Sequence, residues 1–193
     1  MKSNKIYLIF FLFIFSFVSC QNENKYHNEK IGWTISFPQG FENMNLQKQE
    51  VQTVITKQQK EEKKEIPKQK KEFEAIRFKG LNFNFLLVNL EKDDSANDIL
   101  KVVKKQNEIL IKNFKQSRPQ AKFETKIMNE TIGNIDFIKS SLKIDLGNNT
   151  FQNFLTYSAK IKNYNTNFII FYVIENEETK EIINAFKNSK FAQ

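Results

Sequence analysis

Large apolar residues occupy every second position over several stretches of the chain, which is the pattern of β-strands that bury one face. The first stretch covers residues 31–37, and its apolar positions are Ile31, Trp33, Ile35 and Phe37. The same alternation predicts a hairpin over residues 73–87, in which one face of the second strand carries Leu81, Phe83, Phe85 and Leu87. Further strands are predicted over residues 123–127, 137–146, 151–161 and 168–174. The last of these is a continuous apolar run, so we expect it to be the central strand.

Apolar residues at intervals of three and four predict helices. The longest expected helix covers residues 96–116, where Ser95 and Asp98 resemble a capping box at its start. A closing helix is expected near the end of the sequence, with three inward-facing side chains, Ile182, Ile183 and Phe186. A third helix is expected over residues 46–64, and the charged residues 57–72 are expected to form a projecting arm or loop.

The order of these elements resembles a known fold. The opening strand reads Gly32-Trp33-Thr34-Ile35-Ser36-Phe37-Pro38-Gln39-Gly40-Phe41, and the final helix ends in Asn188-Ser189-Lys190-Phe191. With the long helix after the first hairpin and the meander that follows, they resemble the PsbP-like fold, named after an extrinsic protein of photosystem II. The resemblance covers about residues 28–191 and implies an α+β fold, an antiparallel sheet packed between helices as an α/β/α sandwich. None of that family's metal-binding or partner-binding residues matches this chain.

The first twenty residues predict how the chain is targeted and anchored. Lys2 and Lys5 precede an apolar run over residues 6–18, which is too short for the roughly 20 residues of a membrane-spanning helix but typical of a signal peptide. Ser19-Cys20 resembles the lipobox of bacterial lipoproteins, which implies lipidation of Cys20, the single cysteine. The alternative is an ordinary secretory peptide with an incidental cysteine. We expect a signal peptide over residues 1–19, a lipidated tether over 20–30 and one domain over 31–191.

The anchor also predicts a location. Gln21, and not the aspartate associated with inner-membrane retention, follows Cys20, so the outer membrane is favoured, and the periplasmic or surface face is left open. The chain carries 30 Lys and Arg against 22 Asp and Glu, mostly interspersed, and Arg77 and Arg118 are its only arginines. Because base and phosphate recognition favours arginine, we expect no nucleic-acid binding. The expected partners are the membrane, through lipidated Cys20, and an envelope protein.

Few residues indicate catalysis or metal binding. His27 is the single histidine, and beside a tether it is expected to be a surface residue. The acidic residues Glu91, Asp93, Asp94 and Asp98 lack the glycine and closing glutamate of a calcium loop, and acids are expected at a helix start. We therefore expect no metal and no cofactor. Ser140, Ser141 and Ser158 have no histidine nearby in the sequence to activate them, and the carboxylates of Asp136 and Asp145 are the remaining candidates for a hydrolase.

Three functions follow from this sequence. The first is a lipid-anchored envelope protein that acts as a non-catalytic accessory or binding protein. The second is a carrier or sensor of an apolar or peptide ligand, which needs a cavity lined by Trp33, Tyr157, Tyr164 and Tyr172. The third and least favoured is a hydrolase, which needs two carboxylates that converge in a pocket. The first is expected, because it requires only the anchor and one folded domain.

Overall fold

The computed structural model of the chain describes residues 24–44, 73–92 and 98–192. In this part the chain forms two antiparallel sheets and two helices. The small sheet has the order β1-β2-β10, from β1 (Asn24–Asn28), β2 (Trp33–Phe37) and β10 (Lys190–Phe191). The large sheet has the order β3-β4-β5-β9-β8-β7-β6, from β3 (Glu42–Met44), β4 (Phe73–Lys79), β5 (Phe85–Lys92), β6 (Lys122–Ile132), β7 (Ile135–Asp145), β8 (Phe151–Ile161) and β9 (Tyr164–Tyr172).

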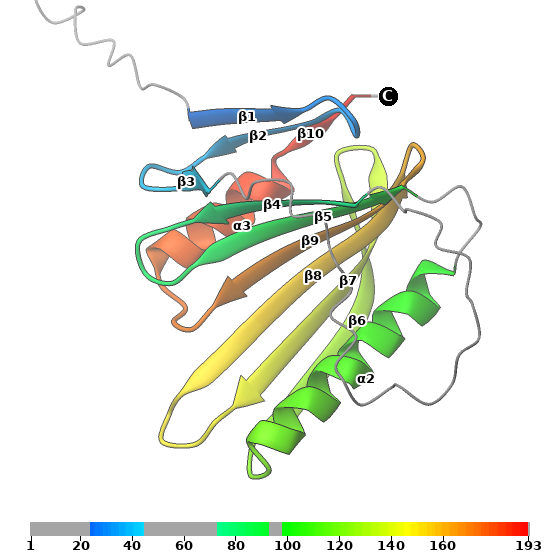
Figure 1. Cartoon of the computed structure of the whole chain (residues 1–193). Coiled ribbons are helices and arrows are strands. Elements are labelled where there is room, and N and C mark those ends of the chain that lie inside the picture. The colour runs from blue at the N-terminus through cyan, green and yellow to red at the C-terminus, as the bar shows by residue number, and fades with distance from the viewer. Residues whose placement is uncertain (1–23, 45–72, 93–97, 193) are drawn as a thin grey trace, which may run out of the picture.

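The two helices lie on opposite faces of the large sheet (Figure 1). Helix α2 (Ile99–Ser117) packs against β7 and β8, and the side-chain amide of Asn107 donates to the Ser140 hydroxyl at 2.8 Å. Helix α3 (Glu177–Lys187) and the small sheet cover the other face. The architecture is therefore dominated by sheet, with one helix on each side, as the α+β prediction requires.

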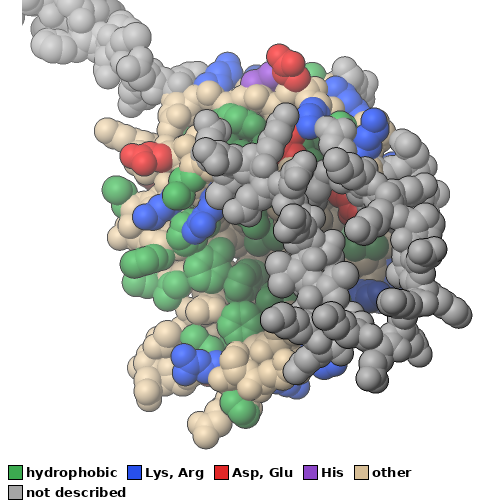
Figure 2. Space-filling model, viewed as in Figure 1, with side chains coloured by type: hydrophobic (Ala, Val, Ile, Leu, Met, Phe, Trp, Pro, Cys, Tyr) green, Lys and Arg blue, Asp and Glu red, His purple; other side chains and the backbone are tan. Residues whose placement is uncertain are grey.

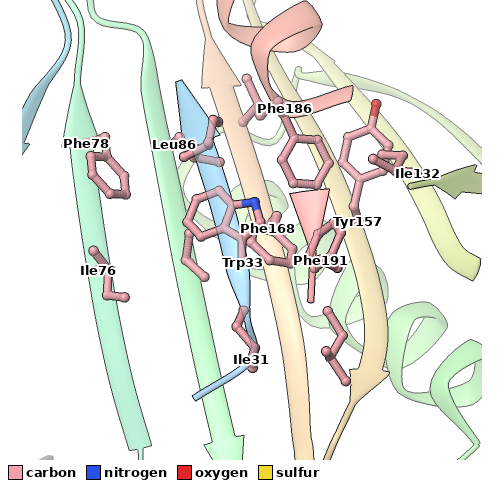
Figure 3. Packing of buried hydrophobic residues seen from close by; sticks show 14 of the residues in the cluster. Ile31, Trp33, Ile76, Phe78, Leu86, Ile132, Tyr157, Phe168, Phe186 and Phe191 are labelled. Carbon is pink, nitrogen blue, oxygen red and sulfur yellow. The ribbon is translucent and has the colours of Figure 1, made fainter. Parts of the chain in front are cut away.

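The core lies between the large sheet, α3 and the small sheet (Figure 3). Trp33 of β2 is fully buried and meets the ring of Phe168 at 4.9 Å between centroids. Phe186 of α3 then contacts Phe168 at 4.9 Å and Tyr157 of β8 at 4.8 Å. Aromatic rings bury a large apolar area, so these contacts join all three layers.

The meander and both described helices confirm the sequence predictions. Strand β9 contains the apolar run as far as Tyr172 and lies between β5 and β8, inside the sheet, whereas Ile174 at the end of the run is exposed. Helix α2 begins at Ile99, later than predicted, and the carboxylate of Asp98 caps it by accepting from the backbone N–H of Lys101 at 3.2 Å, while Ser95 lies outside the described residues. The predicted helix over residues 46–64 and the arm over 57–72 lie outside the described residues.

The predicted second strand of the hairpin was wrong in its start and in its buried face. The backbone N–H of Gly80 donates to the carbonyl of Asn84, so residues 80–84 form a loop and β5 begins at Phe85. The buried face of β5 carries Leu86, Val88 and Leu90, each 0% exposed, whereas the side chains of Leu81 and Phe83 are 78% and 68% exposed. Shifting the pattern by one residue exchanges the two faces of a strand.

The predicted tether over residues 20–30 was wrong for its second half. Residues 24–28 form β1, which pairs antiparallel with β2 along its whole length. The half-buried ring of Tyr26 packs edge-on against Phe78 and Trp33, with centroids 5.0 and 5.7 Å away, and Asn28 is buried. This stretch is polar in sequence but is held by main-chain pairing and by the two aromatic contacts of Tyr26.

Candidate functional site

An open groove of about 910 Å³ lies where the outer face of the small sheet meets the end of α3. The β1–β2 register places Lys25 opposite Ser36 and His27 opposite Thr34, and β10 adds Lys190 on the other side of Thr34. The groove is lined by Lys25, His27, Thr34, Ser36, Ala185, Asn188 and Lys190. We call this set of residues the basic groove.

The alternation of β2 explains why polar groups gather in the basic groove. Trp33 and Ile35 point into the core, so Thr34 and Ser36 between them face outward. The imidazole Nδ1 of His27 lies 2.7 Å from the hydroxyl oxygen of Thr34, which fixes the ring against the sheet. The single histidine is thus a surface residue, as predicted, but it lies on a strand and within a groove.

The lining of the basic groove matches an anionic ligand. It offers two ammonium groups, an imidazole, two hydroxyls and one amide, and it contains no carboxylate. Lysine binds anions as a flexible point charge, and hydroxyl and amide groups supply neutral hydrogen bonds. Sequence reasoning missed this site, because Lys25 and Lys190 come from opposite ends of the described chain.

The acidic residues considered for calcium do not form a site in the described part of the chain. Asp98 caps α2, and Glu91 lies on β5, while Asp93 and Asp94 fall outside the described residues. No group of three potential metal ligands comes together among residues 24–44, 73–92 and 98–192.

The carboxylates considered for hydrolysis do not converge. Asp136 and Asp145 lie near opposite ends of β7, about 30 Å apart along an extended strand. The Asp136 carboxylate accepts from the Thr131 hydroxyl at 2.7 Å, and that of Asp145 accepts from the backbone N–H of Gly147 at 2.8 Å. Each acid therefore has a local structural partner, and the pair that a glycosidase-type mechanism needs is not formed.

The candidate serines also have structural roles. The hydroxyl of Ser140 accepts from Asn107, and that of Ser158 donates to the side-chain oxygen of Asn167 at 2.7 Å. The hydroxyl of Ser141 lies 3.5 Å from the backbone carbonyl of Lys126. All three are on the large sheet, whereas His27 is on the small one. These three serines therefore do not form a Ser–His pair with His27.

The four aromatic side chains expected to line a ligand cavity belong to the core or pack against it. Trp33 and Tyr157 are 0% exposed and Tyr164 is 9% exposed, while Tyr172 is half-buried. Burial, with a smaller effect of the nearby Glu130 charge, raises the pKa of Tyr157 to about 12. The groove described above is lined by none of these four side chains, which contribute to the core or pack against it.

A second surface lies at the loop between β4 and β5. Three large apolar side chains stand exposed there and in the loop before α3: Leu81, Phe83 and Ile174, the last 62% exposed. The two loops meet at Thr179, whose hydroxyl lies 2.8 Å from the Ile174 carbonyl and 3.3 Å from the Asn84 side-chain oxygen. We call Leu81, Phe83 and Ile174 the apolar tip.

A row of aromatic rings continues from the apolar tip across the large sheet. Phe85 lies 6.0 Å from Phe171, which lies 5.0 Å from Phe154, and the guanidinium of Arg77 stacks over Phe85 at 4.2 Å. Figure 2 shows hydrophobic side chains gathered over this end of the large sheet. In the described segments, no helix is both long and apolar enough to span a bilayer.

A charged cluster lies at the opposite end of the large sheet. The Glu130 carboxylate contacts the ammonium groups of Lys139 at 2.7 Å and Lys187 at 2.9 Å. Burial alone raises the pKa of Glu130, but these two hydrogen bonds and charges outweigh it and hold the pKa below its ordinary value. The cluster links α3 to β6 and β7, and its charges are satisfied internally.

Comparison with solved structures identifies the fold. The structure is similar to the solution structure of cyanobacterial PsbP (CyanoP) from Synechocystis sp. PCC 6803, with a TM-score of 0.55. The two sequences are 10% identical, and the match covers 87% of this chain and 91% of the other. No protein-family model and no curated protein matches the sequence. At this identity the likeness shows the fold alone, and it confirms the predicted PsbP-like arrangement of the domain.

Proposed function

We propose that this chain is a lipid-anchored lipoprotein of the cell envelope that acts as a non-catalytic accessory or binding protein. The signal-like segment and the Ser19-Cys20 pair support attachment through Cys20, and Gln21 after the cysteine favours the outer membrane. It is supported by the separation of Asp136 from Asp145 and by the structural partners of the serines, because neither set forms the catalytic arrangement that a hydrolase would need from it.

The observation that carries a binding role is the basic groove. An open surface that collects Lys25, His27 and Lys190 without a carboxylate in its lining favours a negatively charged partner. We assign it to the carboxylates of an acidic segment on an envelope protein, because several flexible ammonium groups along a groove suit several separate carboxylates. Such contacts contribute to partner choice and association rate, and they weaken as salt concentration rises.

The anchor is tested by cell fractionation. The Cys20→Ala variant is expected to leave the membrane fraction, because burial of acyl chains is the proposed attachment. Unchanged sedimentation of this variant would count against lipidation.

The groove is tested by titrating the protein with an oligoglutamate peptide and following backbone amide shifts by NMR. The shifts are expected to concentrate on β1, β2 and β10 and to be lost in the Lys25→Glu/Lys190→Glu variant. A matched control, Lys122→Glu/Lys126→Glu, makes the same charge change at two exposed lysines of β6 and is expected to bind as the wild type does. Equal weakening in both variants would mean that net charge, and not the groove, attracts the peptide.

A further inference from the structure

We propose that the apolar tip rests on the bilayer that holds Cys20 and so fixes the orientation of the domain on the membrane. This inference rests on the proposed lipid anchor, and it adds a second contact that nothing in the signal segment predicts. The occupant of the apolar tip is the lipid surface itself, in the interfacial layer of headgroups and upper acyl chains.

The apolar tip is presented by a fixed loop. The Glu178 carboxylate accepts from the backbone N–H groups of Leu81 at 2.5 Å and Asn82 at 3.1 Å, and from the Asn82 side-chain amide at 2.6 Å. Phe83 has a positive φ of 57°, a conformation that a bulky residue rarely adopts. The loop is therefore held by α3, while its large side chains point into solvent. In this position they gain no stabilisation from burial.

The described chain begins beside this loop. The side-chain amide of Asn24, the first described residue, donates to the backbone carbonyl of Phe41. Phe41 and Gly40 in turn pack against the loop, since a Cβ added to Gly80 would lie 2.8 Å from the Phe41 ring and one added to Gly40 would lie 3.3 Å from Leu81. In Figure 1 the start of β1, the β4–β5 turn and the connection from β9 to α3 all lie on the left of the molecule.

The length of chain before Asn24 limits how far this end can stand from a membrane. Four residue steps separate Cys20 from Asn24, and they span at most about 14 Å when fully extended. A lipidated Cys20 lies at the level of the headgroups, so the edge of the domain that carries Leu81 is held within reach of the bilayer. The apolar tip holds the three most exposed large apolar side chains of the described residues, and burying it in the interface removes them from water.

The charges around the apolar tip favour apolar contact over attraction to anionic lipids. Lys25 and Lys79 lie at this end, but so do Glu42, Glu175 and Glu177. This mixture gives no single-sign patch of the kind that binds anionic headgroups. The contact is therefore expected to form on neutral phosphatidylcholine and to change little with salt.

The test places an environment-sensitive fluorophore on the full-length lipidated protein. The label is attached through Phe83→Cys, and a control is labelled through Ile109→Cys on the exposed side of α2, where the side chain is 49% exposed. Both proteins are reconstituted in phosphatidylcholine vesicles. We expect a blue shift and loss of aqueous quenching at position 83 but not at 109. The double substitution Leu81→Ser/Ile174→Ser is expected to reverse the effect at position 83.

Two outcomes overturn the inference. If the protein still floats with the vesicles but the fluorophore at position 83 remains exposed to water, the anchor is present and the proposed contact is refuted. If the fluorophore is shielded from water in native membranes but exposed to water in the vesicles, the apolar tip contacts a partner protein and not the lipid. Failure of the anchor itself is recognised separately, because the unaltered protein would then not float.

Discussion

The carboxylate of Glu178 at the start of α3 accepts a hydrogen bond from the backbone N–H of Leu81, 97 residues earlier in the chain. The same carboxylate binds both donors of Asn82, so one side chain holds three N–H groups of the loop. A charged acceptor makes stronger hydrogen bonds than a neutral one. The position of the apolar tip therefore depends on a residue from the far end of the domain.

Replacing Glu178 by Ala is expected to free the β4–β5 loop without unfolding the domain. Hydrogen exchange at the amides of Leu81 and Asn82 should become faster, and the free energy of unfolding should fall by about 1–2 kcal/mol. Glu177→Ala is the matched control, because Glu177 is adjacent to Glu178 and its carboxylate pairs with the ammonium group of Lys180 on the surface of the same helix. Equal exchange rates in both variants would show that the carboxylate does not hold the loop.

The aromatic core should be far less tolerant. Phe186→Ala removes a fully buried ring that contacts Phe168 and Tyr157, and it leaves a cavity between α3 and the sheet. We expect a loss of about 3–5 kcal/mol, measured by denaturant unfolding. Phe83→Ala removes a ring of the same size from an exposed position and is expected to cost less than about 0.5 kcal/mol. Similar losses for the two variants would contradict the burial of Phe186.

The raised pKa of Tyr157 predicts that the domain loses stability at alkaline pH. Its folded-state pKa of about 12 lies above the ordinary value of 10, so the neutral hydroxyl is favoured in the folded protein. The resulting stabilisation is complete below pH 10 and is lost as the pH rises toward 12. The Tyr157→Phe variant should therefore lose less stability over this interval, measured by denaturant unfolding at each pH. An unchanged pH dependence would show that other groups dominate the alkaline loss.

The Tyr157→Phe change also tests an unpaired group at neutral pH. The buried hydroxyl has no hydrogen-bond partner among the described residues, so it is desolvated without compensation. Removing it is expected to raise the free energy of unfolding by about 1 kcal/mol. A loss of stability at neutral pH would indicate that the hydroxyl has a partner after all, such as a bound water.

The lowered pKa of Glu130 predicts that the domain loses stability at acidic pH. Its pKa is lowered in the folded protein, so its ion pairs stabilise the fold above the unfolded-state pKa, and this stabilisation is lost as the pH falls through the folded-state pKa. Glu130→Gln should reduce the free energy of unfolding by about 1 kcal/mol at pH 7, and its difference from the wild type should shrink as the pH falls below 4.5, the ordinary pKa of a glutamate. Glu124→Gln, an exposed residue of the same strand, is the control and should show neither effect.

Sequence patterning predicted the elements whose two faces differ clearly. In β2, Trp33 and Ile35 are buried while Thr34 and Ser36 face outward, and the sequence alone indicates this. In β5 both faces are apolar, since Leu86 faces the core and Leu87 the opposite side. The alternation therefore continued plausibly from the strand into the loop, and it assigned Leu81 and Phe83 to the interior.

The candidate surfaces were not predictable, because each joins residues that are distant in sequence. Lys25 and Lys190 reach the basic groove from strands at either end of the described domain, and neither has a local motif. Leu81 and Ile174 lie in two loops that Glu178 and Thr179 both bind from the start of α3. Strand β1 was missed because its side chains are mostly polar and its pairing uses the main chain.

Strand β10 joins the two ends of the domain in a way that bears on how the protein folds. Phe191 pairs with Trp33 inside the small sheet, so the contact that completes this layer closes almost the whole domain as one loop. Such long-range pairing loses loop-closure entropy before the contacts that stabilise it have formed, and it therefore slows folding. The small sheet is thus expected to assemble late in folding.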